Sequence, residues 1–304
     1  MDEIQIKNFS WSFTNKCNLR CLHCIIDSGE EKNKELTTQE AKNVINQLYE
    51  LNCGCIHFTG GECLTKPNFL EIAQYCKDKG LKATLVTNAT LVNENNIDII
   101  KNIFNDVRVS LNGSSEESHD KIRGNGNFAK TIKAIKLLNR AHISIIFFIT
   151  LGNINMNEMT NIIKLCHKYN AIGLKIDSIV LEGRALNHED IFKLDDDQIQ
   201  WLVQEFRNNF DGDLTEDDVC NISNESLYLT ADGDVYPCVH LALHNRVKYL
   251  LGNVRDVSVE SMIRKLNKEI YPKCQNKKCV HKFYSKGENY VLGTRNPNNK
   301  VCLC

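Results

Sequence analysis

Short apolar runs alternate with longer amphipathic segments over the first 180 residues, and this alternation limits the possible folds more than any other feature. The short runs have the length of strands, and the longer segments space their apolar residues as helices do. The expected strands are 4–13, 55–61, 82–90, 106–113, 143–152 and 173–180. The expected helices are 37–52, 67–80, 95–104, 128–141 and 156–170. Six strand–helix units are too few for a closed eight-fold barrel, so we predict an α/β fold with a partial (β/α)6 barrel.

The pattern changes after about residue 211. A helix expected over 194–210 precedes this change, and the elements expected after it are a hairpin over 226–244 that turns at Asp232 and Gly233 and a helix over 258–267. The last thirty or so residues are polar and show no periodicity, so we expect a metal or cluster to order them. We therefore predict a barrel domain over 1–211 and a small cysteine-rich domain over 212–304.

Composition excludes several classes of protein. The chain has 304 residues with 37 Lys+Arg against 38 Asp+Glu, a balance that gives no basis for binding nucleic acid. Its N-terminus lacks the pattern of a secretory signal. The most apolar stretch, 143–152, is too short to cross a bilayer. We expect a cytoplasmic protein that does not insert into a membrane.

Fourteen cysteines stand out, and in a cytoplasmic chain clustered thiols indicate metal or cluster ligands rather than disulfides. Three form a triplet, Cys17, Cys21 and Cys24, in the loop after the first strand, where barrel folds collect their chemistry. Five others lie in apolar or helical patterns and are expected to be small buried side chains: Cys53, Cys55, Cys63, Cys76 and Cys166. The rest form a C-terminal set: Cys220, Cys238, Cys274, Cys279, Cys302 and Cys304.

The triplet is one ligand short of a complete thiolate metal site. Soft thiolates select zinc, copper(I) or iron–sulfur clusters. A zinc ion would need a fourth ligand nearby, and His23 is poorly placed between two of the cysteines. A four-iron cluster held by three cysteines leaves one iron without a protein ligand, where a substrate or cofactor can bind.

The C-x3-C-x2-C spacing after the first strand resembles the radical S-adenosylmethionine (SAM) superfamily. In that family SAM chelates the open iron. Electron transfer from the cluster then cleaves SAM to methionine and a 5'-deoxyadenosyl radical, which abstracts hydrogen from a substrate. Further stretches match the family in order: FTGGEC (58–63), VTNAT (86–90), VSLNGSSEESHDKIRGNGNF (109–128), TLGNIN (150–155) and VLEGRA (180–185). The resemblance implies cofactor contacts by Gly60, Gly61, Glu62, Asn88, Ser110, Arg123, Asn153 and Arg184. Asn112 replaces the family's usual aspartate.

The spacing of Cys220, Gly233 and Cys238 resembles the opening of SPASM and twitch domains, which hold auxiliary four-iron clusters. The later cysteines depart from the SPASM pattern, and six cysteines are too few for two fully ligated clusters. The resemblance therefore implies at least one auxiliary [4Fe–4S] cluster, with a second, incompletely ligated cluster or a structural zinc as alternatives. Cys279 or Cys302 is a candidate hydrogen-atom donor or open cluster position. All six cysteines of the C-terminal set are candidate ligands.

The resemblance implies an enzyme that modifies a ribosomally synthesised peptide by thioether or other crosslink formation or by epimerisation. Two alternatives stay open: a radical SAM enzyme acting on a small molecule or cofactor precursor, and a non-enzymatic iron–sulfur carrier. A carrier would not need the Gly60, Gly61 and Glu62 motif. Since only sixteen residues precede Cys17, a peptide's leader would be recognised elsewhere, including by a separate leader-binding protein. An external donor such as flavodoxin or ferredoxin would supply electrons.

Overall fold

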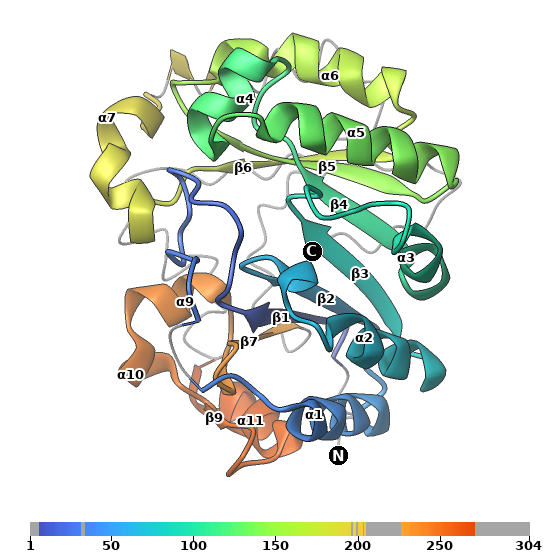
Figure 1. Cartoon of the computed structure of the whole chain (residues 1–304). Helices are drawn as coiled ribbons and strands as arrows, with labels where there is room; N and C mark the ends of the chain where they lie inside the picture. The colour runs from blue at the N-terminus through green and yellow to red at the C-terminus, as the bar shows by residue number, and fades with distance from the viewer. Residues whose placement is uncertain are drawn as a thin grey trace.

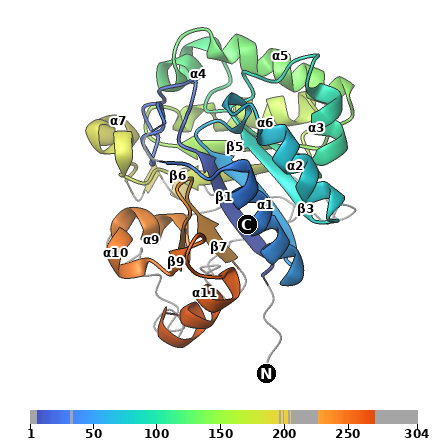
Figure 2. The same cartoon turned by 60° about the horizontal axis from the view of Figure 1, so that its bottom comes forward.

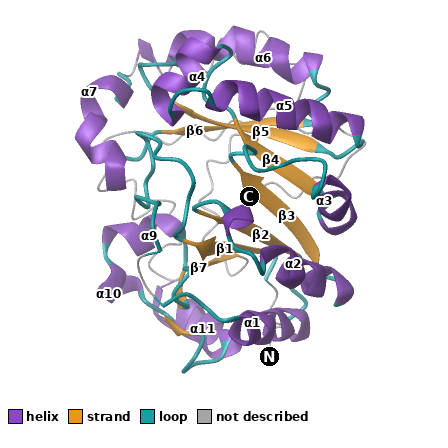
Figure 3. Ribbon diagram, viewed as in Figure 1, coloured by secondary structure: helices purple, strands orange, loops and turns teal. Residues whose placement is uncertain are grey.

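A single open sheet organises the chain (Figures 1 and 3). The computed structural model describes residues 6–31, 34–195, 197–198, 200–202, 204 and 226–270. Its strands are β1 Asn8–Thr14, β2 Cys55–Gly60, β3 Lys82–Thr87, β4 Asp106–Ser110, β5 Ile145–Leu151, β6 Gly173–Ser178, β7 Ser226–Leu229, β8 Asp234–Tyr236 and β9 Gly252–Asn253. They are arranged in the order β6-β5-β4-β3-β2-β1-β7-β8-β9. The first six are parallel, which confirms the predicted strand–helix architecture.

Helices lie along the outside of this curved sheet (Figure 1). Those predicted from periodicity are α1 Thr38–Glu50, α2 Phe69–Asp78, α3 Ile97–Ile103, α5 Asn127–Arg140, α6 Met159–Lys168 and α11 Val259–Lys265. The sequence analysis did not predict the helices α4 Glu116–Arg123, α7 Glu189–Phe192, α9 Val239–His244 and α10 Arg246–Tyr249. The helix expected over 194–210 lies largely outside the described residues. The expected hairpin is shorter than 226–244, because its second strand ends at Tyr236 and helix α9 follows.

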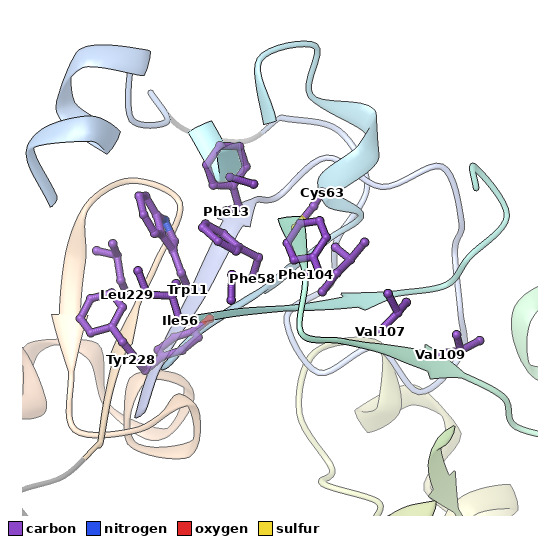
Figure 4. Packing of buried hydrophobic residues seen from close by; sticks show 14 of the residues in the cluster. Trp11, Phe13, Ile56, Phe58, Cys63, Phe104, Val107, Val109, Tyr228 and Leu229 are labelled. Carbon is purple, nitrogen blue, oxygen red and sulfur yellow. The ribbon is translucent and has the colours of Figure 1, made fainter. Parts of the chain in front are cut away.

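The period-two alternation of the strands sorts their side chains between the two faces of the sheet. Trp11 and Phe13 of β1 and Phe58 of β2 point toward the helices, where they pack with Phe69 of α2 and Phe104 (Figure 4). The Trp11 and Phe58 ring centroids are 5.6 Å apart. The five scattered cysteines are buried as predicted: Cys53, Cys55, Cys63, Cys76 and Cys166. The alternate positions of the strands, many of them polar, are left to line the inner face.

The described C-terminal residues continue the same sheet. Strand β7 pairs in parallel with β1, from Asn8 opposite Ser226 to Trp11 opposite Leu229. The hairpin between β7 and β8 turns at Gly233, as predicted. Helix α11 packs against α1, and Figure 2 shows α9, α10 and α11 together on the β7 side of the molecule. Arg255 adds an ion pair across this junction, its Nε lying 2.6 Å from Oε1 of Glu40.

Several predictions lie outside the described residues: the ligand and catalytic roles of Cys220, Cys274, Cys279, Cys302 and Cys304. Within the described ranges, no helix combines the length and the apolar character that crossing a membrane requires.

Candidate cofactor and substrate site

A cavity of about 460 Å3 lies inside the curve of the sheet. Cys17, Cys21 and Cys24 all line it, together with residues from each of the strands β1 to β7. The loops at the carboxyl ends of β1 and β2 form part of its wall. The triplet and the strand ends that the sequence singles out therefore face one common space.

Backbone hydrogen bonds fix the loop that carries the triplet. The Cys17 N–H donates to the Gly29 carbonyl at 2.8 Å, and the Gly29 N–H donates to the Asn15 carbonyl at 2.9 Å. The Cys24 carbonyl accepts from the Arg184 N–H at 3.0 Å. These bonds hold the three thiols at the cavity, where the Cys17 sulfur accepts from the Leu19 N–H at 3.4 Å and the Cys24 sulfur accepts from the Ser28 N–H at 3.3 Å.

The chemistry of this loop fits an iron–sulfur cluster. Burial raises the pKa of Cys17 to about 11 and also raises the pKa of Cys21, because removal from water penalises the thiolate. Iron ions would supply the positive charge that stabilises these thiolates. His23 also lines the cavity, and its buried Nδ1 has no hydrogen-bond partner. Among the described side chains, no three Cys, His, Asp or Glu residues converge as a single metal ion would require.

The end of β2 approaches the triplet loop too closely for any side chain at Gly61. The Gly61 N–H donates to the Thr14 carbonyl at 2.7 Å, and the Glu62 N–H donates to the Lys16 carbonyl at 2.8 Å. A Cβ atom on Gly61 would lie 2.2 Å from the Lys16 oxygen. Gly60 and Gly61 both line the cavity, so backbone groups are exposed there for a ligand.

Glu62 lies behind the cavity wall rather than in it. Its side chain is 0% exposed, and its carboxylate accepts hydrogen bonds from the Asn88 N–H at 2.8 Å and the Thr87 hydroxyl at 2.9 Å. These bonds tie Glu62 to the end of β3, and the direct ligand contact expected from the sequence stays a prediction. Asn88 does line the cavity, and its Nδ2 donates to Oδ1 of Asn18 at 3.0 Å.

Arg123, the last residue of α4, reaches the triplet. Its Nη1 donates to the Cys21 sulfur at 3.8 Å, and its Nε donates to Asn112 Oδ1 at 2.6 Å. Ser110, at the end of β4, lines the same cavity. Arg123 and Ser110 thus lie where a cofactor at the triplet would be contacted. Asn112, which replaces the family's usual aspartate, thus lies directly against Arg123.

Arg184 braces the triplet loop from the end of β6. Its Nε donates to the Cys21 carbonyl at 2.9 Å, and its Nη1 donates to the Ser28 carbonyl at 2.8 Å. The same Nη1 lies 2.6 Å from Oδ1 of Asp27. Arg184 also lines the cavity, so it can position the loop and contact a ligand.

Asn153 is not among the residues that line the cavity, and the cofactor contact expected of it stays a prediction. Its side chain is exposed, and its Oδ1 accepts from Gln198 at 3.1 Å. The chain turns directly after β5, and Asn155, two residues later, is buried. The Asn155 amide is buried and donates to the carbonyls of Asn112 and Thr150.

The inner face of the sheet adds residues that the sequence analysis did not single out. They are polar, charged or aromatic side chains at alternate strand positions: Ser12, His57, Arg108, Phe148, Lys175 and Tyr228. Arg108 and Lys175 lie over the Phe148 ring, at 5.6 and 5.0 Å from its centroid. The signal that could have found them is a polar residue at every second position of an otherwise apolar strand.

Comparisons with known protein families agree with this arrangement. The model of the radical SAM superfamily matches residues 11–166, just over half of the chain. The model of SPASM, an iron–sulfur cluster-binding domain, matches residues 220–282.

Two curated relatives differ in what their names say they do. The AdoMet-dependent heme synthase of Methanosarcina barkeri is 31% identical over 199 residues, covering 64% of this chain and 57% of that protein. The mycofactocin maturase MftC of Mycobacterium tuberculosis is 27% identical over 264 residues, covering 81% of this chain and 66% of that protein. The chain thus spans less than two thirds of the length of either relative.

Among solved structures, Streptococcus suis SuiB bound to S-adenosylmethionine aligns with a TM-score of 0.73 and 14% identity, covering 90% of this chain and 68% of SuiB. SuiB bound to its precursor peptide SuiA aligns with a TM-score of 0.72 at the same identity, covering 90% and 67%. At this identity the likeness shows the fold alone. The family match spans the triplet, the glycine pair and strands β1 to β5. This chain therefore belongs to the radical SAM superfamily, with a [4Fe–4S] cluster and SAM as cofactors, and carries a SPASM cluster-binding domain.

Proposed function

We propose that this protein cleaves SAM reductively and uses the resulting radical to modify a ribosomally synthesised peptide. The observation that carries the proposal is the continuity of one cavity from the triplet to Tyr228, Val239 and His240. These three residues belong to the stretch matched by the SPASM model. A substrate in the cavity would thus contact both the radical source and the cluster-binding domain.

The division of labour among the residues follows from their positions. When bound at the triplet, the cluster and SAM supply a 5'-deoxyadenosyl radical that abstracts hydrogen from the substrate. Asn88, Ser110 and Arg123 are proposed to hold SAM, while Glu62 fixes the end of β3 and Arg184 fixes the triplet loop. Their buried surroundings keep water from the site and strengthen each polar contact.

A peptide substrate is favoured over a small molecule for two reasons. The described strands form an open sheet, and we propose that an extended chain enters the cavity along the open side of this sheet. SuiB, which shares the fold over most of this chain, is known bound to a precursor peptide, and MftC is named a maturase. The heme synthase relative supports the alternative of a small-molecule substrate. Assays with a peptide and with a small-molecule substrate distinguish these two assignments.

Several assignments complete the proposal. The boundary between barrel and cluster-binding domain is placed at 211/212, between the two family matches.

Auxiliary clusters would be held by the C-terminal cysteine set, with Cys279 or Cys302 available to act on substrate. A flavodoxin or ferredoxin would deliver electrons, and a separate protein would bind the peptide's leader. A cytoplasmic location would keep the thiols reduced for cluster assembly.

The test uses the anaerobically reconstituted full chain with SAM, dithionite and the short peptide encoded beside its gene. Mass spectrometry should show loss of a hydrogen pair for a crosslink, or deuterium uptake from D2O for epimerisation. Cys17→Ala should abolish SAM cleavage, whereas Cys220→Ala should keep SAM cleavage and block product formation. An unmodified peptide, with 5'-deoxyadenosine formed only when a porphyrin precursor is added, would contradict the peptide assignment.

A further inference from the structure

The Arg123 guanidinium is a buried positive charge beside the triplet. Its side chain reaches Cys21 and lies 3.5 Å from Nε2 of His23, and the residue is only 8% exposed. Among the described residues, no carboxylate oxygen lies within 4.0 Å of its nitrogens. Its partner at Nε is the neutral amide of Asn112. The charge of Arg123 is therefore oriented by hydrogen bonds but not neutralised by an ion pair.

The surroundings of Asn112 require an amide. Its Oδ1 accepts from Arg123 Nε, and its Nδ2 donates to the Thr150 carbonyl at 2.9 Å. A guanidinium can only donate and a carbonyl can only accept, so one orientation of the amide satisfies both neighbours. An aspartate would place a second oxygen against the Thr150 carbonyl. Because Asn112 is 0% exposed, no water could relieve that repulsion.

We propose that Asn112 is a positioning residue that sets the charge beside the SAM-binding cluster. It fixes the Arg123 guanidinium against the Cys21 sulfur without adding a negative charge beside it, and the buried Glu62 carboxyl acts on Arg123 only from beyond ion-pair distance. Hydrogen bonds to ligand sulfurs and nearby positive charge favour the reduced, more negative state of an iron–sulfur cluster. The effect is strong at this position because both residues are withdrawn from water. Asn112 thereby raises the reduction potential of the cluster and eases its reduction by the electron donor.

The test is a redox titration of the reconstituted full chain, followed by electron paramagnetic resonance. The signal of the SAM-binding cluster is identified as the part of the reduced spectrum that is missing when Cys17, Cys21 and Cys24 are all changed to alanine. Asn112→Asp keeps an acceptor for Arg123 but adds a negative charge. It should make the cluster at least tenfold harder to reduce, a shift of about 59 mV toward negative potential for one electron. Asn43→Asp is the matched control, because the same change at an exposed position of α1, outside the cavity lining, should leave the potential unshifted.

A second variant covers the case in which Asn112→Asp fails to fold or to bind iron. Arg123→Gln removes the positive charge and keeps amide donors, so it should shift the potential in the same direction. In the Arg123→Gln background, Asn112→Asp should add less than it does alone. An unchanged or more positive potential in Arg123→Gln, or in a well-folded Asn112→Asp, overturns the proposal. The measurement needs no peptide, so its failure would be separate from failure of the proposed function.

Discussion

Gly61→Ala is the substitution that most sharply tests how the triplet loop is held. The added Cβ would lie 2.2 Å from the Lys16 carbonyl oxygen and 2.7 Å from the Lys16 carbonyl carbon. Both are backbone atoms, so no side chain can rotate away. Lys16 directly precedes Cys17, and its carbonyl accepts from the Glu62 N–H. The new methyl group therefore pushes against the segment that positions the first cluster ligand.

The size of the effect follows from the displacement. The contact must lengthen by about 0.8 Å to reach 3.0 Å, below which real Cβ contacts are essentially never seen. Overpacking of this kind costs about 1–3 kcal/mol of stability. A displacement of about 1 Å in a reacting group lowers rates by roughly a hundredfold. We expect Gly61→Ala to form 5'-deoxyadenosine about a hundredfold more slowly than the unaltered chain.

The assay is dithionite-dependent 5'-deoxyadenosine formation by protein with a measured iron content, alongside a thermal unfolding curve. Gly80→Ala is the control, because Gly80 has a φ of 83° but no atom within 4 Å of its added Cβ. It lies between α2 and β3 at the opposite end of the sheet. Backbone strain should lower its stability by about 1 kcal/mol and leave SAM cleavage intact. Wild-type cleavage by Gly61→Ala would refute the reasoning.

Two further predictions concern stability. Thr87→Val removes the hydroxyl that donates to both oxygens of the buried Glu62 carboxylate, and should cost about 1.5–3 kcal/mol in urea unfolding. An unchanged midpoint would mean that other groups satisfy the carboxylate. The ion pair with Arg255 lowers the pKa of Glu40 to about 2, so this stabilisation is present above the carboxyl's usual pKa and is lost as pH falls toward 2. Glu40→Gln should therefore lose about 1 kcal/mol at neutral pH, the usual upper value for a surface ion pair. The difference from the unaltered chain should vanish near pH 2, and a constant difference would point to packing instead.

The sequence predicts the strands well because their signals are local. Period-two alternation and glycine or asparagine at strand ends identify β1 to β6 without any knowledge of their partners. Helix α4 was missed for the opposite reason. Its residues are mostly polar, and its limits depend on a capping box at Ser115 and on Gly124, which takes a φ of 97°. Neither the capping serine nor the glycine stands out in the stretch 109–128, which is rich in serine, glycine and asparagine.

The site is predicted less completely because its side-chain directions depend on distant residues. Glu62 turns away from the cavity because Thr87 and Asn88, about 25 residues later, supply its hydrogen-bond donors. Whether Asn153 or Asn155 is the buried residue depends on how the chain turns after β5. Such contacts are set by tertiary packing and leave no mark in the local pattern.

The docking of β7 is another long-range feature. The hairpin could be predicted from its turn residues, but its pairing with β1 joins positions as far apart as Asn8 and Ser226. This pairing brings Tyr228 into the cavity, where its hydroxyl lies 2.7 Å from that of Ser12. No periodicity in either segment indicates which strand edge the hairpin will join.

The central claim is that the triplet holds a cluster whose fourth iron is left for SAM. It is tested most directly by measuring iron and acid-labile sulfide in the anaerobically reconstituted chain and in a variant with Cys17, Cys21 and Cys24 all changed to alanine. The variant should lose about four irons and four sulfides while keeping those of the auxiliary site. A variant that retains the full iron and sulfide content of the unaltered chain would contradict the claim.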